Sequence, residues 1–388
     1  MIPPDGSRLQ ALPGLACVEI CAGAGGQALG LERAGFEHRA LVELDDDAVR
    51  TLRTNRPHWN VLHTDVRGIS ADDLWPSGQK QEIALLAAGV PCPPFSLAGQ
   101  QLGAADERDL FPAVLALAAR LKPRAVLIEN VKGILQAKFA NYRTDVLQQL
   151  EDLGYAASWQ LLRACDFGVP QLRPRAVLVA LWPQSFTRFI WPTPTTCADT
   201  APSVGSVLYQ SMASRGWELA REWADSAAAI APTLCGGSRK HGGADLGPSR
   251  ARQVWAELGV NGSSVADAPP LPGTPLPVKL TVAQMALLQG FPPDWAITGR
   301  KTAAYRQVGN AFPPPVATAV GRSIATVLIQ TGSGTGPCSP HTGWLGTSAS
   351  GSSRHVPVAS PGVMAQTGTS SRTDSQRPSL ALSAGTAE

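Results

Sequence analysis

Short apolar runs alternate with helical patterns along residues 16–182, and this alternation limits the possible folds more than any other feature. The runs that we predict to be strands are 16–23, 39–44, 60–65, 83–89, 125–130 and 176–182. Between them, residues 27–35, 46–55, 109–122 and 142–154 carry apolar side chains at helical spacing. Strands and helices that alternate at this pitch predict an α/β fold with a doubly wound, mostly parallel sheet.

The composition of the chain changes near residue 183. Residues 183–278 are rich in proline, threonine and glycine and show no repeated strand–helix pattern, so they predict a smaller, irregular second domain. Helical periodicity returns at 280–291 and 319–330. Serine, glycine, threonine and proline dominate residues 331–388, and such a segment buries too little apolar surface to order itself. We expect a disordered tail there.

The composition of the 388 residues is that of a soluble globular protein, with 44% hydrophobic and 16% charged residues. The formal net charge of +3 permits a nucleic-acid partner without requiring one. The sequence contains neither a secretory signal pattern nor 18 consecutive apolar residues, so we expect a cytoplasmic protein without a membrane span. The seven cysteines form no C-x-x-C pair, which argues against a zinc site and against a disulfide framework. We predict no metal.

The segment "EICAGAGGQALG" (19–30) places glycines between a predicted strand and a predicted helix. Such glycines let the backbone approach a bound cofactor closely. Glu43 ends the second strand 20 residues after Gly23, where a carboxylate can accept hydrogen bonds from ribose hydroxyls. Asp65 ends the third strand and could meet an adenine edge. Alone, this pattern fits NAD, FAD and S-adenosylmethionine equally, and it also fits a tight turn without a ligand.

The segment "GVPCPPFS" (89–96) sets Cys92 among three prolines. Because proline fixes φ and removes a backbone donor, the segment predicts a stiff loop rather than a helix or a central strand. It follows the strand at 83–89, so Cys92 lies at the carboxyl edge of the sheet, where open α/β folds bind ligands. A thiol there can act as a nucleophile once deprotonated, although a lone cysteine is more often inert packing.

Two further groups of polar residues lie beside predicted strands. Glu129 and Asn130 end the strand at 125–130, and a partly buried carboxyl group there can act as a general acid. Arg173 and Arg175 alternate into the strand at 176–182, and two guanidiniums aimed the same way suit a planar or anionic oxygen ligand. The alternatives are a helix cap or surface ion pair for Glu129, and a solvated strand edge for the arginines.

Taken in order, the segments "AGAGG", "PCPPFS", "ENVKG", "QLRPR" and "QVGNAFPPPV" resemble the DNA cytosine-5 methyltransferase family of bacterial and phage type. The resemblance runs from about Val18 to Gly321, and "QLGAADERDLF" (101–111) and "LTVAQMALLQGFP" (280–292) belong to it. The chain departs from the family at Glu19 and Cys21, where Asp and Phe are usual, and at Leu44, where an aromatic residue is usual. Two prolines also follow Cys92 in place of the usual polar residue.

The resemblance implies a Rossmann-like domain that methylates C5 of a flipped-out cytosine, with S-adenosylmethionine as co-substrate. It implies that the Cys92 thiolate attacks C6, that Glu129 protonates or hydrogen-bonds N3, and that Asn130 braces the loop. Arg173 and Arg175 would hold the O2 side of the ring. The residues that it assigns to the cofactor are Cys21, Gly23, Gly25, Gly26, Glu43, Asp65, Pro91 and Asn310.

The resemblance also implies that 279–330 folds back onto 1–182 to complete one catalytic domain. It implies that 183–278 is a target-recognition domain for double-stranded DNA. The residues that we expect at the DNA are Gln171, Arg239, Lys240, His241, Arg250 and Arg252, with phosphate contacts as probable for the arginines as base contacts. We expect a monomer in the bacterial cytoplasm, associated with DNA, and a functional link to a cognate restriction endonuclease.

Three other functions compete with this interpretation. A relative that only binds nucleic acid would share the fold, but the presence of Cys92, Glu129 and both arginines argues against it. A methyltransferase of the same family that acts on tRNA is the second, and the roughly 95-residue recognition region favours DNA over it. A nicotinamide oxidoreductase is the third, and it has no use for "PCPPFS" or "QLRPR".

Overall fold

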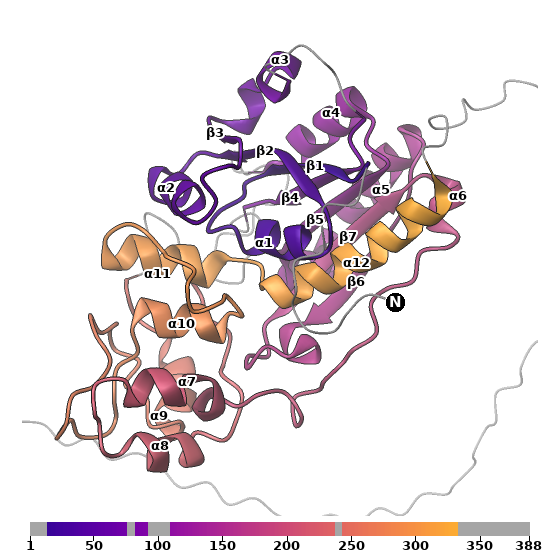
Figure 1. Ribbon diagram of the computed structural model, residues 1–388. Coiled ribbons are helices and arrows are strands. Elements are labelled where there is room, and N and C mark those ends of the chain that lie inside the picture. The colour runs from indigo at the N-terminus through magenta and orange to yellow at the C-terminus, as the bar shows by residue number, and fades with distance from the viewer. Residues whose placement is uncertain (1–13, 76–81, 92–108, 237–242, 333–388) are drawn as a thin grey trace, which may run out of the picture. The chain divides into compact units, whose positions relative to one another are not determined.

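A seven-stranded sheet forms the centre of the molecule, with strand order β3-β2-β1-β4-β5-β7-β6 (Figure 1). The computed structural model describes residues 14–75, 82–91, 109–236 and 243–332. The strands are β1 (Ala16–Ile20), β2 (Glu37–Glu43), β3 (Val61–His63), β4 (Leu85–Gly89), β5 (Ala125–Val131), β6 (Ala156–Arg163) and β7 (Pro174–Leu181).

The strand pairing confirms the predicted doubly wound sheet. The pairs β1–β2, β2–β3, β1–β4 and β4–β5 are parallel, and β7 lies antiparallel between β5 and β6. The chain order reverses at β1, which pairs with β2 on one side and β4 on the other. Ligands of open α/β sheets bind at such a reversal, outside the carboxyl ends of the strands.

Strand β6 is absent from the sequence prediction. It lies at the edge of the sheet, and most of its residues are half-buried or exposed, so "AASWQLLR" lacks the continuous apolar run that marks a buried strand. The antiparallel direction of β7 was likewise not predicted, because the direction of a strand leaves no mark on its own composition.

The helices are α1 (Gly26–Arg33), α2 (Asp46–Asn55), α3 (Ala71–Leu74), α4 (Phe111–Leu121), α5 (Ala140–Asp152), α6 (Pro183–Phe186), α7 (Val204–Ala213), α8 (Ala220–Ser226), α9 (Ser249–Glu257), α10 (Val282–Leu288), α11 (Lys301–Asn310) and α12 (Pro314–Thr331). Short 3-10 turns occupy Val66–Gly68, Lys132–Leu135, Ala137–Phe139 and Ala164–Phe167.

Helices cover both faces of the sheet. Val18 and Ile20 of β1 pack in one core with α4 and α5, whereas Cys17 packs in another core with α1 and α12. Side chains of a strand alternate between its two faces, so these two cores lie on opposite sides of the sheet. The three-layer arrangement places the carboxyl ends of β1, β2, β4 and β5 along one edge.

Helix α12 packs closely on α1 because glycine faces the contact from both sides. A Cβ at Gly30 would lie 2.4 Å from the Ala317 Cβ, and one at Gly321 would lie 2.8 Å from the Ala34 Cβ. Val320 and Ile324 of α12 are fully buried, and each such side chain contributes about 1.5–3 kcal/mol. The C-terminal helix thus belongs to the same fold as the first strand.

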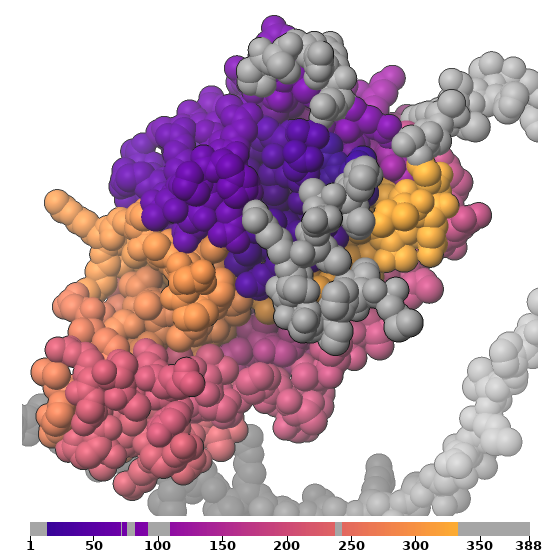
Figure 2. Space-filling view, viewed as in Figure 1, coloured from indigo at the N-terminus to yellow at the C-terminus, as the bar shows by residue number. Residues whose placement is uncertain are grey.

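Residues 183–278 form helices α6 to α9 and irregular connections in the part that the structure describes. Trp223 and Trp255 of this region are fully buried and share one apolar core with Leu52 of α2 and Met285 of α10. Figure 2 shows the N-terminal region, in indigo, directly against the orange C-terminal region. All described residues fall within one compact unit, Met1–Pro340, so the domain boundaries at 182/183 and 278/279 stay predictions.

One stretch, Lys301–Thr331, meets the length and apolarity that a membrane-crossing helix needs among the described residues. It comprises α11 and α12, and 61% of its most apolar window is buried inside the fold. That burial is typical of a core helix. Helix α12 ends at Thr331, the first residue of the predicted tail, and residues 333–388 lie outside the described residues.

Candidate active site at the carboxyl edge of the sheet

The turn between β1 and α1 combines unusual backbone angles with a close approach to a distant segment. Gly23 and Gly25 have positive φ values of 54° and 81°, and Cys21 has a φ of 55°. These angles lie in the left-handed region, which glycine enters freely. A Cβ at Gly26, the first residue of α1, would lie 2.2 Å from the Phe312 carbonyl oxygen. The "AGAGG" turn therefore needs these glycines, and it contacts the "NAFPPP" segment.

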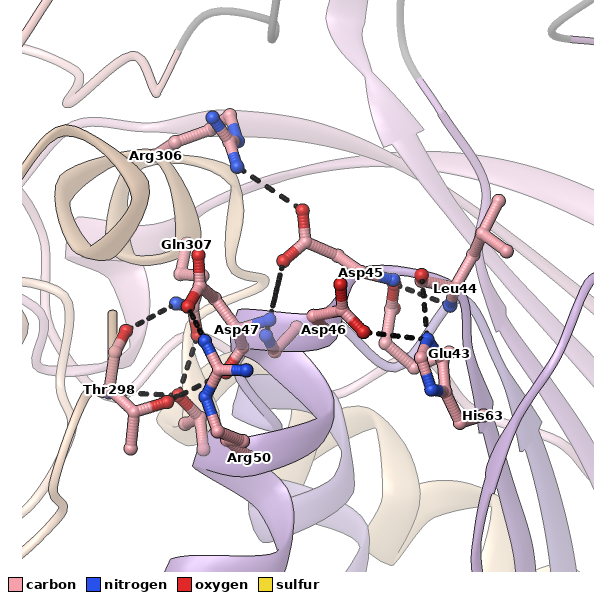
Figure 3. Close-up of polar contacts among 12 residues, drawn as sticks. Glu43, Leu44, Asp45, Asp46, Asp47, Arg50, His63, Thr298, Arg306 and Gln307 are labelled. Atoms are coloured by element: carbon pink, nitrogen blue, oxygen red, sulfur yellow. Dashed lines mark hydrogen bonds and ion pairs between the residues drawn. The ribbon is translucent and has the colours of Figure 1, made fainter. Parts of the chain in front are cut away.

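Glu43 lies at the end of β2, beside the glycine turn, as the sequence spacing predicts. Its Oε2 accepts a hydrogen bond from the Gly23 N–H at 2.7 Å. Its Oε1 accepts from the Leu44 and Asp45 N–H groups, both at 2.8 Å (Figure 3). The Glu43 carboxylate is thus held by backbone donors, in a geometry that the fold itself sets. Leu44 beside it is 61% exposed, which leaves an apolar surface at this edge.

Asp65 follows β3 and caps the short turn Val66–Gly68. One oxygen accepts from the Arg67 N–H at 2.9 Å, and the other lies 2.6 Å from the Arg67 Nη2. The hydrogen bonds from the Arg67 side chain, followed by that from its backbone, lower the pKa of Asp65. A ligand that binds Asp65 would share the carboxylate with Arg67.

Glu19 and Cys21, the two departures in β1 and its turn, lie below this surface. Glu19 is fully buried, and its Oε2 is 3.2 Å from the His38 Nε2. Burial raises the pKa of Glu19, and His38 lowers it part of the way back. Burial also raises the pKa of the Cys21 thiol, which keeps it a neutral packing group.

Glu129 and Arg175 form a buried ion pair at the carboxyl end of β5. The Arg175 Nε lies 2.8 Å from the Glu129 Oε1, and both side chains are less than 10% exposed. The register places them together, because Glu129 pairs with Val177 of β7 and Arg175 lies two residues before Val177 on the same face of the sheet. Burial raises the pKa of Glu129, and the charges of Arg175 and Arg173 lower it part of the way back. A raised pKa at the mouth of the sheet suits a proton donor.

One buried polar atom at this point lacks a partner among the described residues. The Asn130 Nδ2 makes no hydrogen bond there, whereas the Glu129 Oε1 and the Arg175 Nε contact each other as an ion pair. Buried polar groups normally make hydrogen bonds, so an unpaired amide beside a buried ion pair is typical of a site that receives a polar ligand. Asn130 Oδ1 accepts from the Val131 N–H at 2.8 Å, which fixes the direction of its amide.

Arg173 takes a different course from Arg175, although the sequence alternation predicts that both point the same way. Arg173 precedes β7, has a φ of 27° and is fully buried. Its guanidinium donates to the carbonyl oxygens of Leu234, Gly309 and Ala311 at 2.7–2.8 Å. It thereby joins the start of β7 to Leu234 and to the end of α11.

Gln171 lies beside Arg173 in the same buried network. Its Oε1 accepts from the Leu234 N–H at 2.8 Å, and its Nε2 donates to the Gln289 Oε1 at 2.7 Å. Gln171 is fully buried, so the predicted contact with DNA would require these bonds to break. Gln171 and Arg173 together hold both backbone polar groups of Leu234.

The remaining predicted site residues divide into exposed and undescribed ones. Arg250 and Arg252 are exposed on α9, and Asn310 is exposed at the end of α11. Pro91 is half-buried just beyond β4. Cys92 and the residues Arg239, Lys240 and His241 lie outside the described residues.

Sequence reasoning missed two residues that bring the C-terminal segment to the glycine turn and to β2. The Trp295 Nε1 donates to the Ala24 carbonyl oxygen at 3.0 Å, and the Arg306 Nη2 lies 3.2 Å from the Asp45 Oδ2. More than 250 residues separate the partners in each pair, and no local sequence pattern predicts such contacts.

Among the described residues, no group of three or more His, Cys, Asp or Glu side chains could hold a metal ion. The carboxyl groups of Glu43 and Glu129 and the guanidinium of Arg175 supply hydrogen-bonding atoms and charge at this edge of the sheet.

The family model described as C-5 cytosine-specific DNA methylase matches residues 15–326. The chain belongs to this family. It is a DNA cytosine-5 methyltransferase, and the family chemistry implies S-adenosylmethionine as its co-substrate. The match includes the glycine turn, Glu43, Glu129 and both arginines.

Curated relatives of this methyltransferase match along most of their length. It is 55% identical over 323 residues to the type II methyltransferase M.NaeI of Lentzea aerocolonigenes, covering 82% of this chain and 77% of that relative. It is 48% identical to the type II methyltransferase M.NgoMIV of Neisseria gonorrhoeae, covering 80% and 97%. The solved structure of the Entamoeba histolytica methyltransferase EhMeth shares the fold, with a TM-score of 0.56 and 14% identity over 81% of this chain and 99% of that one.

Proposed function

We propose that this methyltransferase modifies C5 of a cytosine that is flipped out of a specific site in duplex DNA, through a thiolate adduct of Cys92 at C6. The observation that carries the proposal is the buried Glu129–Arg175 pair beside the unpaired amide nitrogen of Asn130. Gly89 of β4 pairs in register with Glu129, and Cys92 follows Gly89 by three residues. Chain connectivity therefore keeps the thiol near the two side chains.

The glycine turn and Glu43 would hold S-adenosylmethionine, which supplies an electrophilic methyl group when bound. Positive φ at Gly23 and Gly25 lets the backbone approach a ligand, and Gly26 opens α1 with its unpaired N–H groups. Glu43 has a carboxylate that backbone donors already orient, and a ribose diol can use its remaining lone pair. We place Asp65 at the adenine, and Cys21, Pro91 and Asn310 at the rim of this site.

The catalytic residues solve one chemical problem, which is the low nucleophilicity of C5 in an aromatic ring. The Cys92 thiolate adds its electron pair to C6 and breaks the aromaticity, so that C5 becomes an enamine carbon able to accept a methyl group. The proton on C5 then leaves to a base, the C6–S bond breaks and the ring electrons are restored. A rigidly held nucleophile gains the most rate from being close to its target atom, and a proline-rich loop can hold the thiol rigidly.

Glu129 and Arg175 would act on the opposite side of the ring. Glu129 donates a proton or a hydrogen bond to N3, which draws electron density from C6 while the thiolate attacks. Arg175 holds the O2 side with its free donors. For Arg173 the three carbonyl contacts support a positioning role beside the predicted catalytic one. Asn130 would orient the Cys92 loop with its amide. These groups supply the charge that the step needs without a metal.

We further propose that residues 183–278 recognise the DNA site and that the enzyme acts as a cytoplasmic monomer. The exposed Arg250 and Arg252 on α9 support this assignment, together with the basic segment Arg239–His241. The relatives named type II methyltransferases support a functional partnership with a restriction endonuclease of the same site. Base contacts and phosphate contacts are separable by changing the DNA sequence.

The test is to express the protein in a bacterial host that lacks cytosine methylation and to sequence the methylated positions of its DNA. We expect 5-methylcytosine at one short recurrent sequence with wild type and none with Cys92→Ser. Scattered methylation without a common site, or full methylation by the Cys92→Ser variant, would contradict the proposal. An assay with tRNA in place of duplex DNA should give no methyl transfer, and efficient transfer to tRNA would favour the alternative substrate.

A further inference from the structure

Strand β2 contains a β-bulge where it pairs with β1. Cys17 of β1 pairs with His38 of β2. The next residue of β1 pairs with Ala40, so Arg39 lies between the two pairs as an extra residue. A bulge of this kind bends the strand and redirects the side chains that follow it.

The bulge sets the direction of the Glu43 carboxylate at the end of the same strand. Beyond the bulge, Leu41 pairs in register with Glu19. Because side chains alternate along a strand, Glu43 lies on the same face as Leu41. On this face its Oε2 accepts from the Gly23 N–H at 2.7 Å. A shift of the register by one residue would move Glu43 to the opposite face of the sheet and away from Gly23.

The contact between Glu19 and His38 spans the bulge. Glu19 pairs with a residue beyond the bulge, whereas its Oε2 lies 3.2 Å from the Nε2 of His38, which precedes the bulge. The two side chains are 1% and 0% exposed, so the contact is shielded from solvent. In a regular strand, His38 and Leu41 would face opposite sides of the sheet. Both lie on the side of Glu19 because Arg39 is an extra residue.

Two neighbouring contacts support the same geometry. The Asn60 Nδ2 donates to the Arg39 carbonyl oxygen at 3.0 Å, which pairs the carbonyl group of the extra residue. The ring of Trp59 packs against the imidazole of His38, with 5.1 Å between the ring centroids. The imidazole is therefore held by a carboxyl group and by an aromatic ring.

We propose that Glu19 is a positioning residue, which together with His38 fixes the bulge and so keeps the Glu43 carboxylate on the glycine turn. The inference rests on the proposed function, because it takes Glu43 as a residue that binds S-adenosylmethionine. Without the pair the bulge can move along β2, and Glu43 is in place in only a fraction of the molecules. The apparent affinity for a ligand falls by the fraction of molecules that are competent to bind it.

The experiment measures the dissociation constant of S-adenosylhomocysteine, which has no methyl group to transfer, by calorimetric titration of the full chain. Glu19→Asp withdraws the carboxylate from His38 by one CH₂ group, so the dissociation constant should rise about fivefold to tenfold. Glu19→Gln keeps the length and an oxygen that can accept from the His38 ring, so it should stay within about twofold of wild type. For both variants, kcat at saturating S-adenosylmethionine should match wild type.

A double variant tests whether Glu19 acts through Glu43. In a Glu43→Gln background, Glu19→Asp should weaken binding by less than about twofold, because the carboxylate that it positions is already absent. Independent effects would instead multiply. Asn60→Asp approaches the bulge from its other contact, since it cannot donate to the Arg39 carbonyl oxygen. It should weaken binding in wild type but not in the Glu43→Gln background.

Val18→Ala is the matched control for a loss of stability. Val18 adjoins Glu19 in β1, is fully buried and packs in the core on the other face of the sheet. Its truncation should lower the melting temperature and leave the dissociation constant as in wild type. A Val18→Ala variant that lost as much affinity as Glu19→Asp would make the effect one of general stability and contradict the inference.

The outcomes distinguish this inference from the proposed function. Wild type that does not bind S-adenosylhomocysteine, or a Glu43→Gln variant that binds it as tightly as wild type, overturns the proposed cofactor site and the inference with it. If Glu43→Gln weakens binding and Glu19→Asp does not, the inference alone is wrong, and effects that multiply in the double variant also contradict it. A loss in Glu19→Asp that is absent from Glu19→Gln and disappears in the Glu43→Gln background supports it.

Discussion

Two glutamates lie at the same edge of the sheet in opposite surroundings. Glu43 accepts three backbone N–H groups at 2.7–2.8 Å and lies beside the exposed Leu44. Glu129 is buried against Arg175, and burial raises its pKa. One carboxylate is oriented by backbone donors, and the other has its pKa raised by burial. The comparison teaches that environment, rather than residue type, separates the roles that we propose for them, a cofactor anchor and a proton donor.

The largest effect is expected when the proton donor is removed. Glu129→Gln keeps the shape and a weak hydrogen-bond donor but cannot supply a proton, so kcat should fall about 10²- to 10⁴-fold. Cofactor affinity should stay as in wild type, because Glu129 lies away from the glycine turn. Methyl-transfer rates and calorimetric titration of S-adenosylhomocysteine measure the two quantities. A weakened affinity with a normal kcat would reverse the assigned roles.

Removal of the partner of Glu129 should change the pH dependence as well as the rate. Arg175→Gln removes a charge that lowers the pKa of Glu129, so that pKa should rise further. In the proposed mechanism the protonated form of Glu129 is the active one, so activity should be lost as pH rises through the folded pKa. The falling limb of the kcat/KM profile should move to higher pH, while the maximum falls about tenfold to a hundredfold through the lost charge-assisted bond. A limb that moves to lower pH contradicts the assignment.

A change at the other glutamate should affect binding and leave the chemical step intact. Glu43→Gln replaces one accepting oxygen by an NH₂ group that opposes the backbone donors, so the dissociation constant of the cofactor should rise about tenfold. At saturating cofactor, kcat should match wild type. Asp46→Asn is the matched control, since Asp46 follows Glu43 by three residues, has a 70% exposed side chain and forms an ion pair with His63 rather than with the glycine turn. If kcat at saturating cofactor fell as far as in Glu129→Gln, the two glutamates would not have the separate roles that we propose.

The smallest expected effect is the difference in stability between alanine variants of two glycines in the same turn. Gly25→Ala meets the Leu52 Cδ2 at 2.7 Å in addition to a φ of 81°, and it should cost about 1–3 kcal/mol of unfolding free energy. Gly23→Ala has a φ of 54° but no atom within 4 Å of its Cβ, so its cost should be about 1–2 kcal/mol. The added Cβ would occupy open space that we assign to the cofactor, so Gly23→Ala should weaken cofactor binding instead. Chemical denaturation and cofactor titration test the pair, and equal losses of stability would contradict it.

Much of this edge could be predicted from the sequence because local patterns encode it. Strand ends follow from apolar runs, so Glu43 and Glu129 are correctly placed at the carboxyl ends of β2 and β5. The spacing of 20 residues between Gly23 and Glu43 becomes a real contact. In each case one strand, its turn and the neighbouring strand are sufficient to fix the geometry.

The rest could not be predicted, because it depends on contacts between distant segments. The direction of Arg173 depends on carbonyl groups at 234, 309 and 311, and the burial of Gln171 depends on Gln289. Strand β6 carries no apolar run because it is an edge strand. These features appear only once the chain has folded back on itself.

The most direct test of the central claim is to trap the enzyme on duplex DNA with 5-fluorocytosine at the target position. Fluorine cannot leave C5 as a cation, so wild type with S-adenosylmethionine should form a denaturant-stable adduct, and Cys92→Ser should form none. At saturating cofactor, Glu43→Gln should form the adduct at the wild-type rate, whereas Glu129→Gln should form it about 10²- to 10⁴-fold more slowly. An adduct in Cys92→Ser, or equal rates for the two glutamate variants, would contradict the account.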